Sequence, residues 1–453
     1  MSVSTNRPSR LGADPLSEKR FRTLVQNTLF VDLQDDEQQK VRDLHNNYRF
    51  TVQEMRIVCE AARDLEMWRE QSLFSWWQDA EQKMIDQRTQ GKAGYEEAGL
   101  GRERKRILMH QLRKHLTKLK QDATVYPKDP EPLTERSPLH FVAGKSDAEI
   151  FGDCPVRSER TLCCNLKTID AVQNCAFGCS YCTIQTFYGD RVAVDPDLNA
   201  KLQRLELEPD RFYHIGSGQS SDSLVWGNRG GILDALCQFA TEHPNVLLEL
   251  KTKSANVKYL IERSIPANVV CSWSLNTEPV VSNEEHFTAS LQQRLQAARK
   301  VADCGIKVAF HFHPMVNYQG WEQDYPALVR RIQSDFNRDE VSFVSLGSVT
   351  FIKPVIKQIR RRGEPTRILQ TDLVKDPHGK LTYSDDLKVE MFKTMYRVLA
   401  PWHGHVFIYL CMEKPEIWDR ALGWRFSSNE EFENAFAAGT LYRRSEVTVC
   451  AEG

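Results

Sequence analysis

Three cysteines with an unusual spacing are the residues of this sequence best suited to do chemistry. Cys175, Cys179 and Cys182 lie in the stretch CAFGCSYC. A loop this tight can present three thiolates to three irons of one [4Fe-4S] cluster, which leaves the fourth iron without a protein ligand. An iron with an open position can bind and reduce a small molecule, whereas a cluster with four thiolates usually transfers electrons. The spacing therefore predicts an enzyme with these three metal ligands.

A zinc site is the alternative interpretation of the same cysteines. Thiolates also bind Zn²⁺, and the neighbouring pair Cys163 and Cys164 could supply a fourth ligand. Zinc loops usually combine two C-x-x-C pairs, and this stretch has only one. Tyr181 completes CxxxCxxC with an aromatic residue, which resembles the signature loop of the radical S-adenosylmethionine enzymes. In that superfamily S-adenosylmethionine chelates the open iron, and the aromatic residue packs near the adenine.

Length and composition place the cysteines in a large protein without a strong overall charge. The chain has 453 residues, enough for two or three domains, and a formal net charge of −1 gives no global attraction to nucleic acid. The N-terminal segment MSVSTNRPSR has no apolar stretch, and no long uncharged apolar run follows it. We therefore expect a cytoplasmic protein with no membrane partner, whose twelve cysteines are kept reduced.

The pattern along the chain predicts four regions. Residues 1–125 look helical, and within them Thr51 and Glu54 have the spacing of a capping box. The apolar positions that follow share one helical face: Met55, Val58, Ala62 and Leu65. Residues 126–164 form a Pro-rich connector, which we expect to be exposed and without regular ladders. Residues 165–415 form a partial barrel, and residues 416–453 form a C-terminal extension.

The barrel prediction rests on short apolar or β-branched runs that alternate with helical ones. The runs are NLKTIDAV, FYHIGSG, VLLELKTKS, VVCSWSLN, KVAFHFHPM and EVSFVSLGSV. One connecting helix is indicated by the shared face of Leu291, Leu295, Ala298 and Ala302, with Gly305 as its stop. This alternation predicts an α/β fold with a parallel sheet, a partial (β/α)6-type barrel. Chemistry in such folds gathers at the C-terminal ends of the strands, and the cysteine loop directly follows the first run.

Five ordered segments resemble the spore photoproduct lyase family of radical S-adenosylmethionine enzymes. They are CSYCTIQTFYGD, LELKTKSANVKYL, CSWSLN, TASLQQRLQAARKVADCGIKV and HPMVNYQGW. The resemblance covers about residues 165 to 330 and, more weakly, extends to about 412; it does not cover the N-terminal helical region. It implies reductive cleavage of S-adenosylmethionine to a 5′-deoxyadenosyl radical, which abstracts hydrogen from the substrate. In that family the substrate is a thymine dimer in DNA.

The same resemblance implies which residues contact S-adenosylmethionine. Lys253 in KTKS and Ser274 in SWSLN fall where the family contacts the methionine end, since a carboxylate needs a cationic partner and a hydroxyl can complete its hydrogen bonding. Tyr181 is the aromatic residue of the loop. Gly216 and Gly218 end the second strand, where bare backbone can approach a ligand, although glycines also end ordinary strands.

Two departures from the family concern hydrogen-atom transfer. Repair enzymes of the family carry a cysteine after the second strand that returns a hydrogen atom to the product radical. Here Gln219 or Ser220 occupies that place, and neither can serve, because N–H and O–H bonds hold hydrogen more tightly than S–H bonds do. A tyrosine that normally follows the last cluster cysteine is replaced by Thr183. The cysteine and tyrosine that relay the radical in the repair enzymes are therefore both replaced in this sequence.

A substitute hydrogen donor can be sought among the other residues of the barrel. Cys411, in VFIYLCME near the end of a late strand, is a candidate that faces the same cavity, and the alternative is a small buried core cysteine. His311 and His313 share one face of the fifth strand. These histidines either face cofactor or substrate, or are satisfied core histidines.

Two basic clusters could contact phosphates or could simply be solvated surfaces. The first is the helical segment 102–120, in which Leu108, Leu112 and Leu119 lie near one face. The second consists of Lys353, Lys357, Arg360, Arg361 and Arg362. Solvated surfaces explain both clusters, and binding of phosphate groups is the alternative for both.

These observations together predict a cytoplasmic radical S-adenosylmethionine enzyme that acts on a nucleic acid or nucleotide, as in DNA repair. An electron donor such as a flavodoxin or ferredoxin is the expected partner. One alternative is radical modification of another molecule, without a cysteine hydrogen donor. A second is a non-catalytic binding protein that keeps the cluster as structure while its N-terminal helices recruit a partner.

Overall fold

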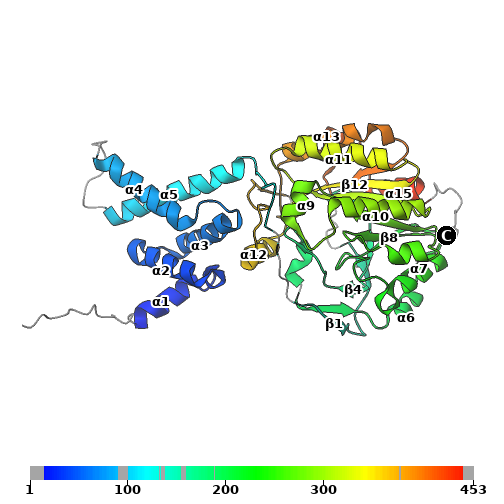
Figure 1. The fold of residues 1–453 in the computed structure, drawn as a ribbon, viewed down its shortest axis with the longest axis horizontal. Helices are drawn as coiled ribbons and strands as arrows, with labels where there is room; N and C mark the ends of the chain where they lie inside the picture. The colour runs from blue at the N-terminus through cyan, green and yellow to red at the C-terminus, as the bar shows by residue number, and fades with distance from the viewer. Residues whose placement is uncertain are drawn as a thin grey trace, which may run out of the picture. The chain divides into compact units, whose positions relative to one another are not determined.

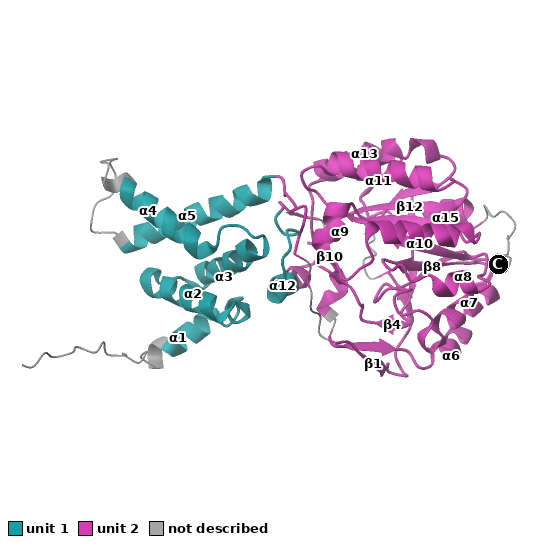
Figure 2. Cartoon of the chain, in the orientation of Figure 1, with its two compact units in different colours: residues 1–122, 357–370 teal, residues 123–356, 371–453 magenta. Residues whose placement is uncertain are grey.

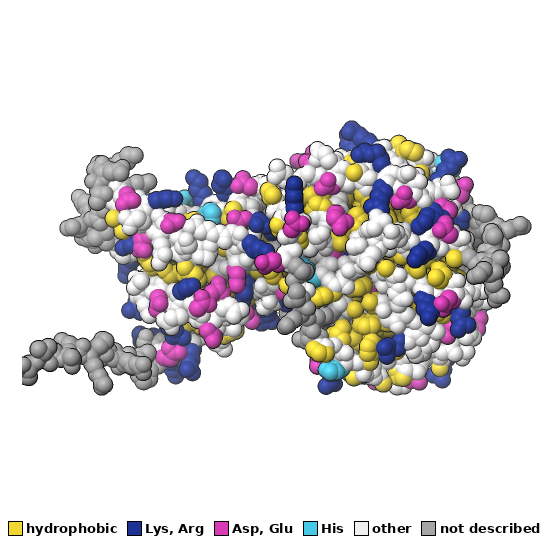
Figure 3. Space-filling view, viewed as in Figure 1, with side chains coloured by type: hydrophobic (Ala, Val, Ile, Leu, Met, Phe, Trp, Pro, Cys, Tyr) yellow, Lys and Arg dark blue, Asp and Glu magenta, His cyan; other side chains and the backbone are white. Residues whose placement is uncertain are grey.

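The computed structural model describes residues 15–89, 100–131, 133, 138–154, 160–187, 189–376 and 379–441. Parts of the predicted connector and C-terminal extension, among them residues 155–159 and 442–453, lie outside these ranges. The chain forms two compact units (Figure 2). Unit 1 consists of residues 1–122 and 357–370, and unit 2 of residues 123–356 and 371–453. On the face drawn in Figure 3, basic and acidic side chains are interspersed.

Unit 1 is helical, and a buried central helix holds it together. Its helices are α1 (Pro15–Val25), α2 (Asp35–Tyr48), α3 (Val52–Met67), α4 (Leu73–Thr89) and α5 (Leu100–Gln121). The capping box at the start of α3 is confirmed, since Thr51 accepts a hydrogen bond from the Glu54 N–H and the Glu54 side chain accepts one from the Thr51 N–H. The apolar face predicted from Met55 to Leu65 is buried. In the described part of the chain no helix is long and apolar enough to cross a membrane.

The segment 357–370 joins unit 1 through charge pairing, although the sequence analysis placed it in the barrel. It includes the end of α12 (Lys353–Arg362). The Arg360 guanidinium donates to both carboxylate oxygens of Asp64, at 2.7 Å each, and the Thr366 N–H donates to the Met67 carbonyl. Arg361 pairs with Asp32 and Arg362 with Glu364. The arginine cluster is therefore balanced by carboxylates of its own unit, which argues against a phosphate site there.

Unit 2 is built on a curled sheet, as predicted (Figure 1). Within the described residues the strand order is β16-β12-β11-β9-β8-β7-β3-β2, and every neighbouring pair is parallel except β2 with β3. The strands are β2 (Phe151–Asp153), β3 (Lys167–Ile169), β7 (Tyr213–Ser217), β8 (Val246–Thr252), β9 (Val269–Ser274), β11 (Val308–Met315), β12 (Val341–Ser348) and β16 (Phe407–Leu410). The partial barrel is thus confirmed, with a seventh parallel strand, β16.

Crossover helices connect the strands, and Figure 1 shows them around the sheet. They are α6 (Leu198–Gln203), α7 (Ile232–Glu242), α8 (Lys258–Glu262), α9 (Glu278–Glu284), α10 (Leu291–Asp303), α11 (Trp321–Asp335) and α13 (Asp385–Val398). The predicted helix is α10: its four apolar positions are buried, and Gly305 lies just past its end with φ 76°. Parallel strands buried between helices explain why the runs are nearly continuous in apolar residues.

The two flanking regions take part in the fold of unit 2 more than the sequence indicated. The predicted connector contains two strands, β1 (His140–Ala143) and β2. Strand β1 pairs in parallel with β6 (Arg191–Val194). These strands can form because they follow the proline-rich part of the connector. The predicted extension contains α14 (Pro415–Leu422) and α15 (Asn429–Thr440). Phe436 of α15 stacks on His214 with ring centroids 4.6 Å apart and so packs into the core of unit 2.

Candidate active site

One cavity of about 870 Å³ lies at the C-terminal ends of the parallel strands. Side chains alternate between the two faces of a strand, so each strand end can contribute a residue to the inner face of the curled sheet. Residues in or just after the strand ends line the cavity: Gly218 after β7, Lys251 in β8, Lys253 after β8, Ser274 in β9, His313 in β11, Gly347 in β12 and Cys411 after β16. The cavity therefore lies where an active site is expected in such a fold, at the C-terminal ends of the strands.

The cysteine loop forms one wall of this cavity and is held by a short two-stranded sheet. The loop follows β4 (Val172–Gln173) and contains β5 (Gly178–Cys179), which pairs antiparallel with β10 (Glu285–His286). The Ser180 N–H donates to the Glu284 carbonyl at 2.8 Å. The Gln185 side chain donates to the carbonyls of Ser180 and Cys182. The three cysteines all line the cavity, so the structure brings the predicted ligands together.

The arrangement of potential metal ligands around the loop bears on the zinc alternative. A zinc ion needs four ligands about 2.3 Å or less from one point. Among the described residues no group of three or more His, Cys, Asp or Glu side chains converges in this way. In a cluster each thiolate binds a different iron, so the sulfurs need not converge. Cys163 and Cys164 lie beside Cys154 and Cys411, not beside the loop.

Three predicted cofactor contacts from separate elements meet beside the loop. The Lys253 ammonium donates to the Ser274 hydroxyl at 2.8 Å. The same ammonium lies 5.7 Å from the centre of the Tyr181 ring, within the range of cation–π attraction. Together they provide a cation, a hydroxyl and an aromatic surface on one wall of the cavity. These groups are suited to an amino acid carboxylate joined to a purine.

A buried ion pair that sequence reasoning missed positions this wall. The Glu285 carboxylate lies 2.6 Å from the Arg294 guanidinium, and both side chains are fully buried. Glu285 accepts hydrogen bonds from the Tyr181 hydroxyl and the Asn276 amide, and Arg294 donates to the Ser274 carbonyl at 2.9 Å. Burial opposes ionisation of Glu285, but Arg294 and Lys253 outweigh it and hold its pKa below the ordinary value. The pair thus joins the cysteine loop to β9.

Asp222 is a second positioning residue that no motif indicated. Its buried carboxylate accepts hydrogen bonds from the Lys253 N–H at 2.7 Å and the Thr252 hydroxyl at 2.8 Å. It also accepts from the backbone N–H groups of Leu224 and Val225. Burial raises the pKa of Asp222 despite these donors. The residue fastens the end of β8, from which Lys253 projects, to the loop after β7.

The two glycines of the second strand have different surroundings. Gly218 lines the cavity with φ 83°, and a Cβ there would lie 2.7 Å from the Ser223 hydroxyl, so only glycine fits. Gly216 does not line the cavity. The side chains of Leu166 and Gln219 cover it, with their nearest atoms 3.2 and 3.3 Å from where a Cβ would stand. We therefore keep the prediction that the backbone approaches a ligand closely for Gly218 and not for Gly216.

Gln219, Ser220 and Thr183, the residues that differ from the family pattern, lie in or next to the cavity. Ser220 donates to the Asp170 carboxylate at 2.6 Å, a bond that links the loop after β7 to the residue after β3. Gln219 and Thr183 both line the cavity. None of Gln219, Ser220 and Thr183 has a thiol.

The two histidines of the fifth strand have separate roles in the fold. His313 lines the cavity, and its ring is hydrogen bonded to the Ser345 hydroxyl at 2.8 Å. His311 lies deeper, where it and His214 contact the two carboxylate oxygens of buried Glu249. This Glu249 network is part of the core below the cavity and holds His311 through its Nε2, whereas the buried Nδ1 of His311 has no hydrogen-bond partner among the described residues.

We expect the stability of the protein to fall as the pH is lowered from about 6.5 toward 4. Burial first, and Lys251 second, lower the pKa of His311 from 6.5 to about 4, against the opposing effect of Glu249. In this window the unfolded chain binds a proton that the folded chain excludes, so acid favours unfolding. Urea unfolding at several pH values measures the slope, and His311→Gln should flatten it. An unchanged slope in that variant would contradict the assignment.

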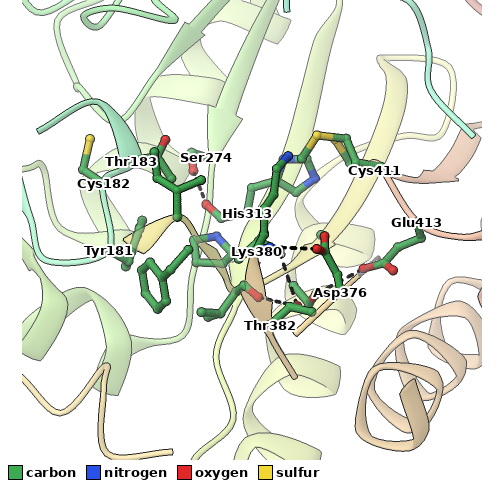
Figure 4. Close-up of a pocket in the computed structure, with 18 of the residues that line it drawn as sticks. Tyr181, Cys182, Thr183, Ser274, His313, Asp376, Lys380, Thr382, Cys411 and Glu413 are labelled. Atoms are coloured by element: carbon green, nitrogen blue, oxygen red, sulfur yellow. Dashed lines mark hydrogen bonds between the residues drawn. The ribbon is translucent and has the colours of Figure 1, made fainter. Parts of the chain in front are cut away.

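A small sheet and several charged side chains complete the far side of the cavity (Figure 4). The sheet consists of β13 (Thr350–Phe351), β14 (Val374–Lys375) and β15 (Leu381–Thr382). Buried Lys388 pairs with Glu413 at 2.6 Å, and Lys414 pairs with Asp385. Charged groups therefore lie opposite the cysteine loop, where they can contact a polar substrate.

Comparison with known proteins identifies relatives of the matched region. The family model for spore photoproduct lyase matches residues 166–397. A spore photoproduct lyase from Geobacillus sp. is 27% identical over 247 residues, which cover 51% of this chain and 72% of the relative. The solved structure of a spore photoproduct lyase complexed with dinucleoside spore photoproduct has a TM-score of 0.52 at 22% identity, covering 60% of this chain and 82% of that chain. A double mutant with bound AdoMet and the same dinucleoside has a TM-score of 0.50 at 23% identity, with the same coverage.

Proposed function

The chain belongs to the spore photoproduct lyase family, and on that premise we propose that it acts on a nucleic-acid or nucleotide substrate. In this proposal Cys175, Cys179 and Cys182 would hold a [4Fe-4S] cluster, which would supply the electron for cleavage of S-adenosylmethionine to a 5′-deoxyadenosyl radical able to abstract hydrogen from the substrate. The observation that carries it is the placement of the three thiols with Lys253, Ser274 and Tyr181 around one cavity. A flavodoxin or ferredoxin is the proposed electron donor.

The chain's own residues would bind and orient S-adenosylmethionine. The Lys253 ammonium offers a charge-assisted hydrogen bond to a carboxylate, and the Ser274 hydroxyl is within reach of the same group. The Tyr181 ring provides an apolar surface, and its hydroxyl is fixed by Glu285. Because these contacts restrict the cofactor to one orientation, they would place its sulfonium group near the open iron.

A nucleotide substrate is supported by the size and charge of the cavity and by the relatives. Ligand cavities commonly have volumes of about 300–1,000 Å³, and this one fits that range. Lys251, Lys375 and Lys380 contribute positive charge to its lining, which favours a phosphate group. The two solved relatives described above were both obtained with dinucleoside spore photoproduct bound. DNA lesion repair is therefore the favoured activity.

Radical modification of another molecule is the second candidate. It is favoured by the resemblance, which puts Gln219 or Ser220 where the repair enzymes carry their cysteine; of these two residues, Ser220 donates a hydrogen bond to Asp170. In such a reaction the 5′-deoxyadenosyl radical is consumed, and no cysteine needs to return hydrogen at this place.

One anaerobic experiment tests the proposal and separates the candidates. The protein is reconstituted with iron and sulfide, reduced and mixed with S-adenosylmethionine, and 5′-deoxyadenosine is measured. Formation of 5′-deoxyadenosine supports radical chemistry, and its absence from a fully loaded cluster would favour a binding protein without catalysis. Addition of dinucleoside spore photoproduct then separates repair from modification, since only repair releases thymine dinucleoside.

A further inference from the structure

A fourth thiol lines the cavity, on the side facing away from the cysteine loop. Cys411 directly follows β16, and its N–H donates to the Leu346 carbonyl at 2.7 Å. Its side chain is partly exposed to the cavity. In Figure 4 the side chains of Cys411 and Cys182 lie on opposite sides of the pocket, with Ser274 and His313 drawn between them. Among the described residues it is the cavity thiol that the predicted metal site leaves unused.

Three more cysteines from two other segments lie behind Cys411. The Leu162 N–H donates to the Glu413 carbonyl at 3.0 Å in an antiparallel bridge, which brings Cys163 and Cys164 next to the end of β16. The Cys163 N–H donates to the Asn429 side chain, and the Cys154 N–H to the Leu166 carbonyl. We call Cys154, Cys163, Cys164 and Cys411 the thiol cluster.

Two members of the thiol cluster, Cys411 and Cys164, have raised pKa values. Burial, followed by the neighbouring thiols of Cys154 and Cys163, raises the pKa of Cys411 well above its ordinary value. The Cys164 pKa is raised by a hydrogen bond with Cys163 and by burial. A protonated thiol is a poor nucleophile and a poor metal ligand. Its S–H bond is, however, weaker than the O–H bond of serine, the N–H bonds of amides and alkyl C–H bonds, so a protonated thiol can donate a hydrogen atom to a carbon radical.

We propose that Cys411 donates a hydrogen atom to a carbon radical in the cavity and that the rest of the thiol cluster restores it. The inference rests on the proposed function, since it needs a carbon radical in the cavity, on the substrate or, without substrate, on the 5′-deoxyadenosyl group. A cysteine that only fills space needs neither an opening to the cavity nor three neighbouring thiols. Cys411 has both an opening to the cavity and three neighbouring thiols. It follows β16, whereas Gln219 and Ser220 follow β7.

The proposed step is balanced in atoms and electrons. The S–H bond of Cys411 breaks homolytically, a C–H bond forms on the substrate, and a thiyl radical remains on Cys411. That thiyl takes a hydrogen atom from Cys163 or Cys154, an exchange between bonds of the same type and so nearly without energy cost. One electron, from the same class of one-electron donor that reduces the metal site, and one proton from water return the last thiyl to a thiol.

Solvent deuterium tests the donor directly, because thiol hydrogens exchange with water. The reconstituted enzyme is reduced in D₂O with S-adenosylmethionine and dinucleoside spore photoproduct, and deuterium is measured in the released dinucleoside. We expect deuterium in the wild-type product, its loss in Cys411→Ser and its retention in Cys271→Ala, the matched control. Cys271 is fully buried in β9, at a position that alternates with the inward-facing Ser272 and Ser274. Retention of wild-type deuterium in Cys411→Ser would overturn the proposal.

A parallel reaction without the dinucleoside decides the case if that probe is not a substrate. Deuterium in 5′-deoxyadenosine should then fall in Cys411→Ser relative to wild type, and equal contents would overturn the inference. Failure of every variant to form 5′-deoxyadenosine would sink the proposed function, and the inference with it. Formation of 5′-deoxyadenosine without a Cys411 effect would sink the inference alone.

Two further measurements address folding and the neighbouring thiols. Cys163 and Cys164 are 3% and 6% exposed, and neither lines the cavity, so both lie behind Cys411. The Cys163→Ala variant should keep the first turnover and slow the later ones. If Cys411→Ser does not fold, as judged by circular dichroism and iron content, Cys411→Ala replaces it.

Discussion

Replacing Cys179 by alanine should abolish the visible absorption of an iron–sulfur cluster and the formation of 5′-deoxyadenosine. Each thiolate of the loop is expected to hold a different iron, so no remaining ligand can take over its role. Alanine keeps the backbone pairing of Cys179 with Glu285, and the fold should survive. Iron and sulfide content after anaerobic reconstitution, the absorption spectrum and product analysis measure the effect.

The matched control for this prediction is Cys271→Ala, which removes a buried thiol that does not line the cavity. It should load iron and form product as the wild type does. An unchanged spectrum in Cys179→Ala would show that the ligands are assigned wrongly. Stoichiometric zinc in the purified wild type, with no binding of iron after reconstitution, would instead restore the zinc interpretation.

Replacing Glu285 by glutamine should destabilise the protein by about 3–5 kcal/mol, because it leaves the Arg294 charge buried without a counter-charge. Glutamine has nearly the same shape and can still accept the hydrogen bond from Tyr181, so the loss reports on charge. Both side chains of the pair are fully buried, and no water can replace the carboxylate. Urea unfolding at neutral pH measures the change in the free energy of unfolding.

A double variant separates the charge from the rest of the site. Combining Glu285→Gln with Arg294→Met removes the unpaired guanidinium and should recover a large part of the lost stability. Glu278→Gln, at an exposed position of α9, is the matched control and should change little. We also expect weaker binding of S-adenosylmethionine in Glu285→Gln, since Arg294 also contacts the Ser274 carbonyl. Equal stability of Glu285→Gln and wild type would contradict the assigned ion pair.

The structure also changes the interpretation of the charged segments. Arg360 alone would be a plausible phosphate ligand in a basic run. Its bidentate contact with Asp64 instead ties the segment 357–370 to α3 in unit 1. The two residues are 296 positions apart in the chain, and no local pattern links them. The positive charge that remains for a substrate is therefore the charge that lines the cavity, as at Lys251 and Lys380.

The sequence alone determined the features that depend on neighbouring residues. The cysteine spacing, the capping box at Thr51, the buried face of α10 and the alternation of strands with helices all follow from local spacing and periodicity. The family resemblance indicated Lys253 and Ser274, and both line the cavity. Local geometry is enough for such features, because a strand or a helix fixes where its own side chains point.

Only the tertiary structure decided which distant residues meet. It paired Glu285 with Arg294, placed His311 in the core and His313 in the cavity, and covered Gly216 while leaving Gly218 open. It also gathered the thiol cluster from segments far apart in the chain. The physical reason is that burial and charge pairing depend on strand register and on the chain folding back on itself, and a one-dimensional pattern contains neither.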